Sequence, residues 1–228
     1  AATTGAGGNA LASFAANEGI ECFRGSEEDV VKRLLGTGIA YSADAVVRIS
    51  GDCPLIDPEV VDLVTRAFRK GGWQIDYASN VYPSTFPHGL DVEILSLDLL
   101  ERLDRDVDDP FYRDWFSAYV REHPDDFAMV NVTTPTDLHE LRWTVDYPED
   151  LEFVEQVFRY LGPHGERFGM VKVLSLLEQH PELRQINQHL EDRQVVRGIR
   201  SATYHHVLAE RARAMSTEKV RPEDRRAC

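Results

Sequence analysis

Two aspartates in this sequence each follow an apolar, strand-like segment and precede a proline. Asp52 comes after residues 45–50 (AVVRIS) and Gly51, and Asp146 comes after residues 141–145 (LRWTV). In open α/β sheets, ligands bind beside the carboxyl ends of the strands, and Mg²⁺ typically takes one or two carboxylates together with substrate phosphates. The pair therefore predicts a site for one or two Mg²⁺ ions over a nucleoside triphosphate. An Asx turn or a helix cap is the structural alternative for Asp52 on its own.

The segments that must position these aspartates alternate between strand-like and helix-like patterns, as in βαβ units. Asn9, Ser26 and Asp57 are predicted N-caps of helices, and Glu149 and Asp150 lie in a first helical turn, where the macrodipole favours acids. The pattern indicates an α/β fold with one main sheet and helices on its faces. Strands are predicted at 20–23, 45–50, 77–80, 90–95, 128–132 and 141–145, and helices at 9–18, 27–35, 58–70, 97–103, 111–122, 148–160 and 171–179.

Composition excludes several classes of protein. The chain has 228 residues, with 39 Asp and Glu against 25 Lys and Arg, so its formal net charge is −14. This charge repels phosphodiester backbones, which argues against polymeric nucleic acid as a partner. Cys22, Cys53 and Cys228 lie far apart and form no zinc-binding spacing. No apolar run approaches the roughly 20 residues needed to span a bilayer, so we expect a cytoplasmic protein without a membrane partner.

Beyond these features, two runs carry a family resemblance. Residues 51–57 (GDCPLID) and 145–151 (VDYPEDL) resemble the corresponding runs of the cytidylyltransferases that make CMP-sugars from CTP. The resemblance implies a Rossmann-like nucleotidyltransferase fold of the nucleotide-diphospho-sugar transferase type, a three-layer α/β sandwich with a mixed, mostly parallel sheet. More narrowly, four runs in the same order resemble the spore coat polysaccharide biosynthesis protein F group: 23–30, 89–93, 141–146 and 186–189.

The resemblance also implies an activity and a set of site residues. The expected reaction is transfer of CMP from CTP to a sugar acid or related acceptor, with release of pyrophosphate, in polysaccharide or glycan precursor biosynthesis. Asp52 and Asp146 would be the catalytic Mg²⁺ ligands. A homodimer is expected. Candidate nucleotide-binding residues are Arg24, Ser26, Arg33 and Gly51, and candidate substrate-binding residues are His88, Asp91, Glu93, Arg113 and Arg142. The alternatives are surface positions for Arg24 and Arg33 and a buried, hydrogen-bonded pair within 88–93.

The sequence departs from the family pattern at two places. The basic, glycine-containing loop A-R-x-G-S-x-R-x-P-x-K, which holds the triphosphate and the cytosine in the family, has no match, so residues 1–190 are expected to be an N-terminally truncated nucleotidyltransferase domain. Trp115 stands where family members tend to carry a histidine, which bears on the choice of acceptor. Residues 191–228 are Arg-rich and are expected to form a helical tail or a linker.

Two alternative functions stay open from the sequence. Residues 5–10 (GAGGNA) fit the pattern G-x-G-x-x-A before a helix, with Arg24 beyond the next strand, as in an NADP-binding oxidoreductase. No tyrosine is followed by lysine at the fourth position, so the dyad of short-chain dehydrogenases is missing. The other alternative is an inactive, truncated nucleotidyltransferase domain that serves as an interaction module. The two readings differ in what the coding sequence upstream of Ala1 should contain: the enzyme requires the basic, glycine-containing loop there, and the interaction module does not.

Overall fold

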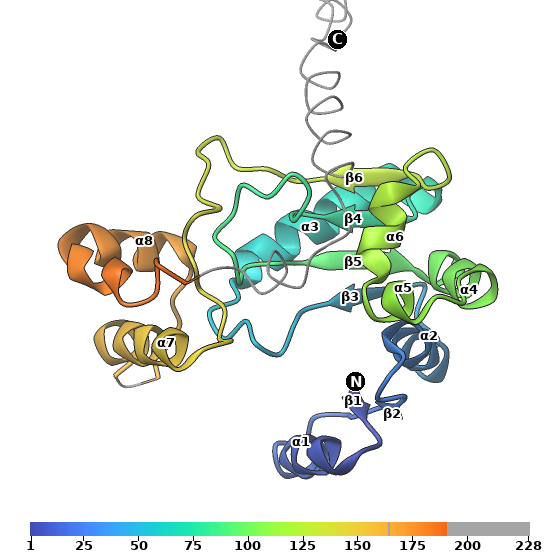
Figure 1. Cartoon of the computed structure of the whole chain (residues 1–228), viewed down its shortest axis with the longest axis horizontal. Coiled ribbons are helices and arrows are strands. Elements are labelled where there is room, and N and C mark those ends of the chain that lie inside the picture. The colour runs from blue at the N-terminus through green and yellow to red at the C-terminus, as the bar shows by residue number, and fades with distance from the viewer. Residues whose placement is uncertain (164, 191–228) are drawn as a thin grey trace, which may run out of the picture. The chain divides into compact units, whose positions relative to one another are not determined.

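The computed structural model describes residues 1–163 and 165–190, of which Ala1–Gln188 form one compact unit (Figure 1). The tail expected at 191–228 lies outside the described residues. None of the described helices is both long and apolar enough to cross a membrane.

A mixed four-stranded sheet forms the centre of this unit, in the order β3-β5-β4-β6. Strand β5 runs antiparallel to both of its neighbours, whereas β4 and β6 are parallel, so three of the four strands share one direction. This arrangement confirms the mixed, mostly parallel sheet. The strands are β3 (Ala45–Arg48), β4 (Tyr77–Ser79), β5 (Glu93–Ser96) and β6 (Met129–Asn131).

Helices cover both faces of the sheet, because successive strand residues point to opposite sides. On β4 and β5, Ala78 and Ile94 belong to one core cluster, and Tyr77 and Leu95 belong to another. The first cluster includes residues of α3 (Pro58–Gly71), α7 (Pro148–Leu161) and α8 (Met170–Gln179). The second includes residues of α2 (Val30–Ala40), α4 (Leu97–Asp106) and α6 (Phe116–Glu122). The result is the expected three-layer sandwich.

The first residues form a small separate sheet. Strands β1 (Ala2–Thr3) and β2 (Arg24–Gly25) pair in parallel and are connected by α1 (Ala6–Asn17). Three short elements complete the described part of the chain: α5 (Pro110–Asp114), the 3₁₀ helix η1 (Gly72–Gln74) and the 3₁₀ helix η2 (Pro181–Gln185).

The predicted caps are partly confirmed. Asp57 caps α3 by accepting from the Glu59 N–H at 2.8 Å, as expected. Asn9 was wrong as a cap: α1 begins at Ala6 after Gly5, and Asn9 lies inside the helix. Ser26 was also wrong, because Asp29 caps α2 and Ser26 instead accepts from the Asp29 N–H in the turn before it.

Three predicted elements differ from the structure. The strand expected at 20–23 has no regular secondary structure, and the strand β2 follows it at Arg24–Gly25, where it pairs with β1. The helix expected at 111–122 is divided into α5 and α6 at Trp115, whose backbone leaves the helical region. The strand expected at 141–145 is an extended segment outside the sheet, with only an isolated bridge between Arg142 and His88. Its backbone groups bond to two loops, so its apolar pattern reflects burial and not membership of a sheet.

Candidate active site

The structure brings the backbone next to Asp146 against the backbone of Asp52. The Val145 N–H donates to the Asp52 carbonyl at 2.8 Å, and the Thr144 hydroxyl donates to the same oxygen at 3.2 Å. Asp52 lies in the exposed turn after β3, and Asp146 is partly exposed just before α7. Two carboxylates far apart in the sequence therefore lie on neighbouring segments, as predicted from their positions after β3 and after the 141–145 segment.

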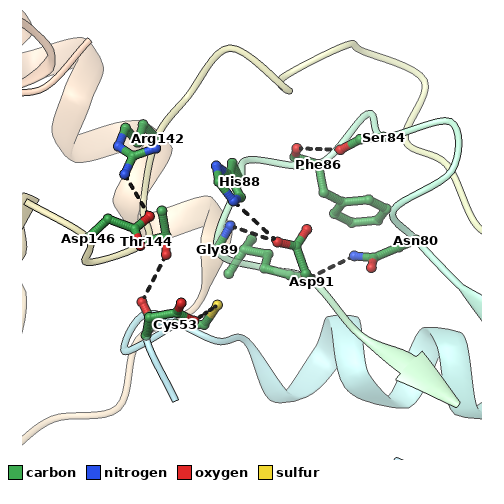
Figure 2. A network of polar contacts seen from close by, with 12 residues as sticks. Cys53, Asn80, Ser84, Phe86, His88, Gly89, Asp91, Arg142, Thr144 and Asp146 are labelled. Atoms are coloured by element: carbon green, nitrogen blue, oxygen red, sulfur yellow. Dashed lines mark hydrogen bonds and ion pairs between the residues drawn. The ribbon is translucent and has the colours of Figure 1, made fainter. Parts of the chain in front are cut away.

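An ion-pair network holds the segment that carries Asp146, and Figure 2 shows one part of it, the bond between Arg142 and Asp146. Arg142 donates to both oxygens of Asp150 at 2.8 Å and also to Asp146 Oδ2 at 2.8 Å. Asp150 accepts further from the backbone N–H groups of Asp146 and Tyr147, both at 3.0 Å. The Asn187 amide donates to Asp150 and to the Arg142 carbonyl, both at 2.9 Å. Arg142, predicted as a substrate ligand, is thus positioned to orient Asp146.

The same network sets the charge states of Arg142 and Asp150. Burial alone raises the pKa of a carboxyl group, but the hydrogen bonds from Arg142, from the Asp146 N–H and from Asn187 outweigh it and hold the pKa of Asp150 below its ordinary value. Burial likewise opposes the charge of Arg142, yet Asp150 and Asp146 raise its pKa. Both groups are therefore charged at neutral pH.

A turn that contains His88 and Asp91 faces this segment (Figure 2). His88 Nε2 lies 3.8 Å from Asp91 Oδ2, and the Gly89 N–H donates to the same oxygen at 3.4 Å. Gly89 has φ +109°, and a Cβ there would lie 2.6 Å from the Trp143 carbonyl carbon. Only glycine permits this close approach. The predicted substrate residues His88 and Asp91 therefore lie beside the segment that carries Arg142 and Asp146.

Asn80 is a residue of this region that the sequence did not single out. It is fully buried, and its amide donates to the Leu90 carbonyl at 2.7 Å and accepts from the Val92 N–H at 2.8 Å. These two bonds flank Asp91 and fix its backbone. The sequence offered one signal for a functional role of Asn80, its position just after a strand. Its hydrogen-bond partners lie 10 and 12 residues away in the chain, so local patterns did not predict these bonds.

Cys53 follows Asp52 and is buried. Its thiol contacts Asp52 Oδ1 at 3.4 Å. Burial, followed by the negative charges of Asp52 and Asp91, raises the pKa of Cys53 far above its usual range. In this environment the thiol is protonated at neutral pH, which makes it a poor nucleophile.

The donor set around Asp52 and Asp146 is compatible with Mg²⁺. Within residues 1–163 and 165–190, no group of three or more acidic, histidine or cysteine side chains is arranged to hold a metal. Mg²⁺ does not need such a group, because it commonly takes one or two carboxylates and completes its coordination with water and substrate phosphates. The exposure of Asp52 leaves room for such ligands.

Glu93, another predicted substrate ligand, lies inside the sheet. It is 3% exposed, and its carboxylate accepts from Arg48 on β3 and from the Tyr77 hydroxyl on β4. Burial opposes the charge of Arg48, but Glu93 raises the pKa of Arg48 above its ordinary value. Both oxygens of Glu93 are engaged in joining three strands, so we leave this residue out of the proposed acceptor pocket.

Arg113 is also placed differently from the expectation. Its guanidinium pairs with Asp29 at 2.6 Å and with Asp104, and it donates to the Val107 carbonyl at 2.8 Å. These contacts join α5 to the start of α2 and to the end of α4. They give Arg113 a structural role, and we leave it out of the proposed site.

Of the predicted nucleotide-binding residues, Arg24, Ser26 and Arg33 lie near the small sheet or in the turn before α2, whereas Gly51 lies next to Asp52. Arg24 donates to the Thr3 carbonyl at 2.7 Å and to Asn9 at 2.8 Å, next to the small sheet. Arg33 donates to the Ser26 carbonyl in the turn before α2. Gly51 directly precedes Asp52 in the exposed turn, so its backbone lies next to one of the two aspartates.

Comparisons with known proteins agree with this arrangement. No family model matches the chain. The spore coat polysaccharide biosynthesis protein SpsF of Bacillus subtilis is 26% identical over 175 residues, which cover 75% of this chain and 70% of that protein. An uncharacterized protein of Methanocaldococcus jannaschii is 26% identical over 189 residues, which cover 81% of this chain and 74% of that protein.

A solved structure provides the strongest link. The cytidylyltransferase of Leptospira borgpetersenii is 30% identical and superposes with a TM-score of 0.77, over 83% of this chain and 79% of that one. This match leaves no support for the oxidoreductase suggested by residues 5–10. The fold, the two aspartates on adjoining segments and this relative lead to one conclusion: the chain belongs to the cytidylyltransferase family, near SpsF, and is a nucleotidyltransferase.

Proposed function

We propose that this protein transfers CMP from CTP to a sugar acid or related acceptor, releases pyrophosphate and depends on Mg²⁺. The observation that carries the proposal is the hydrogen bond from Val145 to the Asp52 carbonyl, which places the two aspartates on adjoining segments. The printed name of the relative SpsF places that protein in spore coat polysaccharide biosynthesis. We infer a role in polysaccharide precursor synthesis for this chain as well.

In the proposed reaction, an acceptor oxygen forms a bond to the α-phosphorus of CTP. The bond from that phosphorus to the oxygen bridging to the β-phosphate breaks, its electron pair leaves with pyrophosphate, and the acceptor hydroxyl loses its proton to water. Mg²⁺, when bound, neutralises charge on the phosphates. Asp52 and Asp146 would hold the metal, and Arg142 would keep the Asp146 carboxylate in place. Because positioning and charge neutralisation supply most of the catalysis in transfers of this kind, we propose direct transfer without a covalent enzyme intermediate.

For the acceptor, we propose a place beside the turn of His88 and Asp91. Both side chains are partly exposed and lie next to the Arg142 segment. An imidazole and a carboxylate together can bind sugar hydroxyl groups as donor and acceptor. Asn80 would keep Asp91 in position through its bonds to residues 90 and 92.

The decisive test is substitution of the two aspartates in the protein expressed from its complete coding sequence. Asp52→Asn and Asp146→Asn should each reduce pyrophosphate release by at least about 100-fold, because each removes a metal ligand. Both should leave the far-UV circular dichroism unchanged. Asp108→Asn, at an exposed position after α4, is the matched control and should keep full activity. Undiminished turnover in both site variants would overturn the proposal.

The interaction-module alternative makes a different prediction. A chain that only binds a protein partner has no need of nucleotide, so it should show no heat of binding when titrated with CTP and Mg²⁺. We expect saturable binding that is lost in Asp52→Asn and kept in Asp108→Asn. Absence of binding in the unaltered protein would favour the interaction module.

A further inference from the structure

Arg48 is a charged residue at the carboxyl end of β3 to which the function proposed above gives no role. It is the last residue of the strand and lies four residues before Asp52. Its Nη1 donates to the Glu93 carboxylate on β5, and its guanidinium lies 5.5 Å from the centre of the Phe116 ring at the start of α6. The Tyr77 hydroxyl donates to the other oxygen of Glu93. Contacts from β5 and α6 therefore hold the guanidinium in one place.

Stability alone does not explain the pair of Arg48 and Glu93. Glu93 is buried between the strands, and a buried charge carries a free-energy cost of desolvation. Apolar side chains of similar size often stabilise a protein interior equally well. The pair instead gives the protein a guanidinium whose orientation is fixed, which is useful where a ligand must be recognised by its shape.

One edge of the Arg48 guanidinium is open. Nη1 is the nitrogen that meets Glu93, whereas Nε and Nη2 have no acceptor among the described residues and both reach solvent. The side chain as a whole is 34% exposed. The N–H groups of Nε and Nη2 are parallel, so this edge can donate two parallel hydrogen bonds to the two oxygens of a carboxylate. The open edge is therefore suited to a planar anion.

The surroundings of Arg48 connect it to the proposed active site. Burial opposes the charge of Arg48, and Glu93 raises its pKa, as does Asp52 more weakly. Burial and Asp91 raise the pKa of Cys53, and Arg48 lowers it, so both charges act on the same thiol. The guanidinium is thus within electrostatic reach of the turn with Asp52 and close to the turn with Asp91.

We propose that Arg48 binds the carboxylate of a sugar-acid acceptor through its Nε–H and Nη2–H groups. This inference rests on the function proposed above and identifies a residue that selects the acceptor. Arg48 and Glu93 form a neutral pair, which favours an anion that fits the two parallel donors over the more highly charged triphosphate. The triphosphate is assigned to Mg²⁺ at Asp52 and Asp146, so the guanidinium is left for the second substrate.

The first test measures binding alone, with the ¹⁵N-labelled protein expressed from its complete coding sequence and without CTP or Mg²⁺. The Arg48 Nε–H resonance is identified by its loss in Arg48→Lys. N-acetylneuraminate, ketodeoxyoctonate and glucuronate are each titrated in parallel with their methyl esters, which lack the negative charge. We expect at least one acid to shift the Arg48 resonance saturably and its ester to leave the resonance in place. If no acid does so, or if acid and ester shift it equally, the proposal is wrong.

The second test separates the acceptor from the nucleotide, with whichever of these acids supports pyrophosphate release. Arg48→Lys should raise KM for the acid by about tenfold to 100-fold, the effect of one or two charged hydrogen bonds, and KM for CTP by less than about twofold. Lysine keeps the positive charge beside Glu93 but lacks the two parallel donors. Arg69→Lys, at an exposed position on α3, is the matched control and should keep both constants.

The outcomes separate the role of Arg48 from the proposed function itself. A larger rise in KM for CTP than for the acid would assign Arg48 to the nucleotide and overturn the proposal. Equal turnover of an acid and its methyl ester would also overturn it, although transfer of CMP would then stand. If no acid supports turnover, or if urea unfolding shows that Arg48→Lys does not fold, the comparison of acid and ester in the unaltered protein decides the role of Arg48.

Discussion

Gly51 lies next to Asp52, and nothing in the fold requires a glycine at this position. A Cβ atom there would meet no other atom within 4 Å, and its φ is outside the left-handed region. Neither packing nor backbone strain therefore requires glycine. A ligand that approaches the backbone closely is a further reason for glycine at such a position, and it agrees with a triphosphate lying over this turn.

Substitution of Gly51 should accordingly affect binding and not folding. We expect Gly51→Ala to change the free energy of unfolding by less than about 0.5 kcal/mol and to weaken binding of CTP with Mg²⁺ by about tenfold. Gly7→Ala, at a second glycine with open space around its Cβ, should keep the affinity. Calorimetric titration and urea unfolding measure the two effects. Equal affinity of Gly51→Ala and the unaltered protein would show that the turn does not contact the nucleotide.

At the scale of residues, the sequence predicted that the segments of the two aspartates adjoin, but not the contacts that support them; the role of the aspartates as metal ligands stays a prediction. Asp52 and Asp146 could be predicted because each follows an apolar segment in the chain. The network of Arg142, Asp150 and Asn187 could not, since Asn187 lies 37 residues beyond Asp150 and local patterns do not show such contacts. The ion pair of Arg113 could not be predicted for the same reason, since its partner Asp29 is 84 residues away.

At the scale of elements, one carboxylate serves the beginnings of two helices. Asp57 accepts from the Glu59 N–H at 2.8 Å at the start of α3, and from the Met170 N–H at 2.7 Å at the start of α8. Gly169 is required beside it, because a Cβ would lie 2.5 Å from the Asp57 carboxylate. Asp57 thus connects the first half of the described chain to the last.

Removal of the Asp57 carboxylate, which bonds to two helix starts, should lower the free energy of unfolding more than removal of a carboxylate that caps one helix. We expect Asp57→Ala to lower the free energy of unfolding by about 2–3 kcal/mol, since one cap typically contributes about 1 kcal/mol and this carboxylate is buried. Asp109→Ala removes an exposed cap from the short α5 and should cost about 1 kcal/mol or less. Urea unfolding measures both. A loss at Asp57 no larger than that at Asp109 would contradict the double role.

Asp150 lies in the first turn of α7 and accepts from the backbone N–H of Tyr147, the residue before the helix. Its charge should make the stability of the protein depend on pH in the acid range. Asp150 has a lowered pKa in the folded protein, so its contribution is fully present above the unfolded pKa and is lost as pH falls through the folded value. Between about pH 5 and about pH 2, the melting temperature should fall more steeply in the unaltered protein than in Asp150→Asn. Asp108→Asn should follow the unaltered protein. If the melting temperatures of Asp150→Asn and the unaltered protein fell with pH at the same rate, the charge of Asp150 would make no contribution to stability.

Elements were best predicted where strong local signals agree. For α3, Asp57, Pro58 and the glycines at its end fix both boundaries, and the structure follows them. For α2, both Ser26 and Asp29 can cap, and the choice of Asp29 is associated with its pairing with Arg113 from α5. The 141–145 segment looks like a strand because it is apolar, but its hydrogen bonds go to the turn at residue 88 and to Asp52.

At the scale of the whole molecule, burial is distributed unevenly. In α1 only Gly8 is buried, and Leu11 and Phe14 are each 61% exposed. In contrast, β5 is paired on both sides, and Ile94 and Leu95 are buried. Segments with few buried apolar contacts open locally at low free energy.

We therefore expect the rate of amide hydrogen exchange to differ strongly between α1 and the central sheet. Peptides from α1 should take up deuterium far sooner than peptides from β5 under native conditions, because opening of β5 requires disruption of both core clusters. Mass spectrometry of peptic fragments gives the comparison, with α4 as a second protected reference. Protection of α1 equal to that of β5 would show that another surface covers it in solution.

The expected homodimer stays a prediction, which light scattering coupled to size exclusion tests.

The hydrogen bond between Val145 and Asp52 has a consequence for synthesis on the ribosome. It closes a loop of 93 residues (145 − 52), and the amide of Asn187 arrives later still. Asp52 is therefore translated long before the residues that complete its surroundings. A nascent chain therefore lacks the complete nucleotide site while its first half folds, so α3 and the β3–β5 pair depend on their own contacts, such as the Arg48–Glu93 ion pair and the Asp57 cap, until the last described helices emerge.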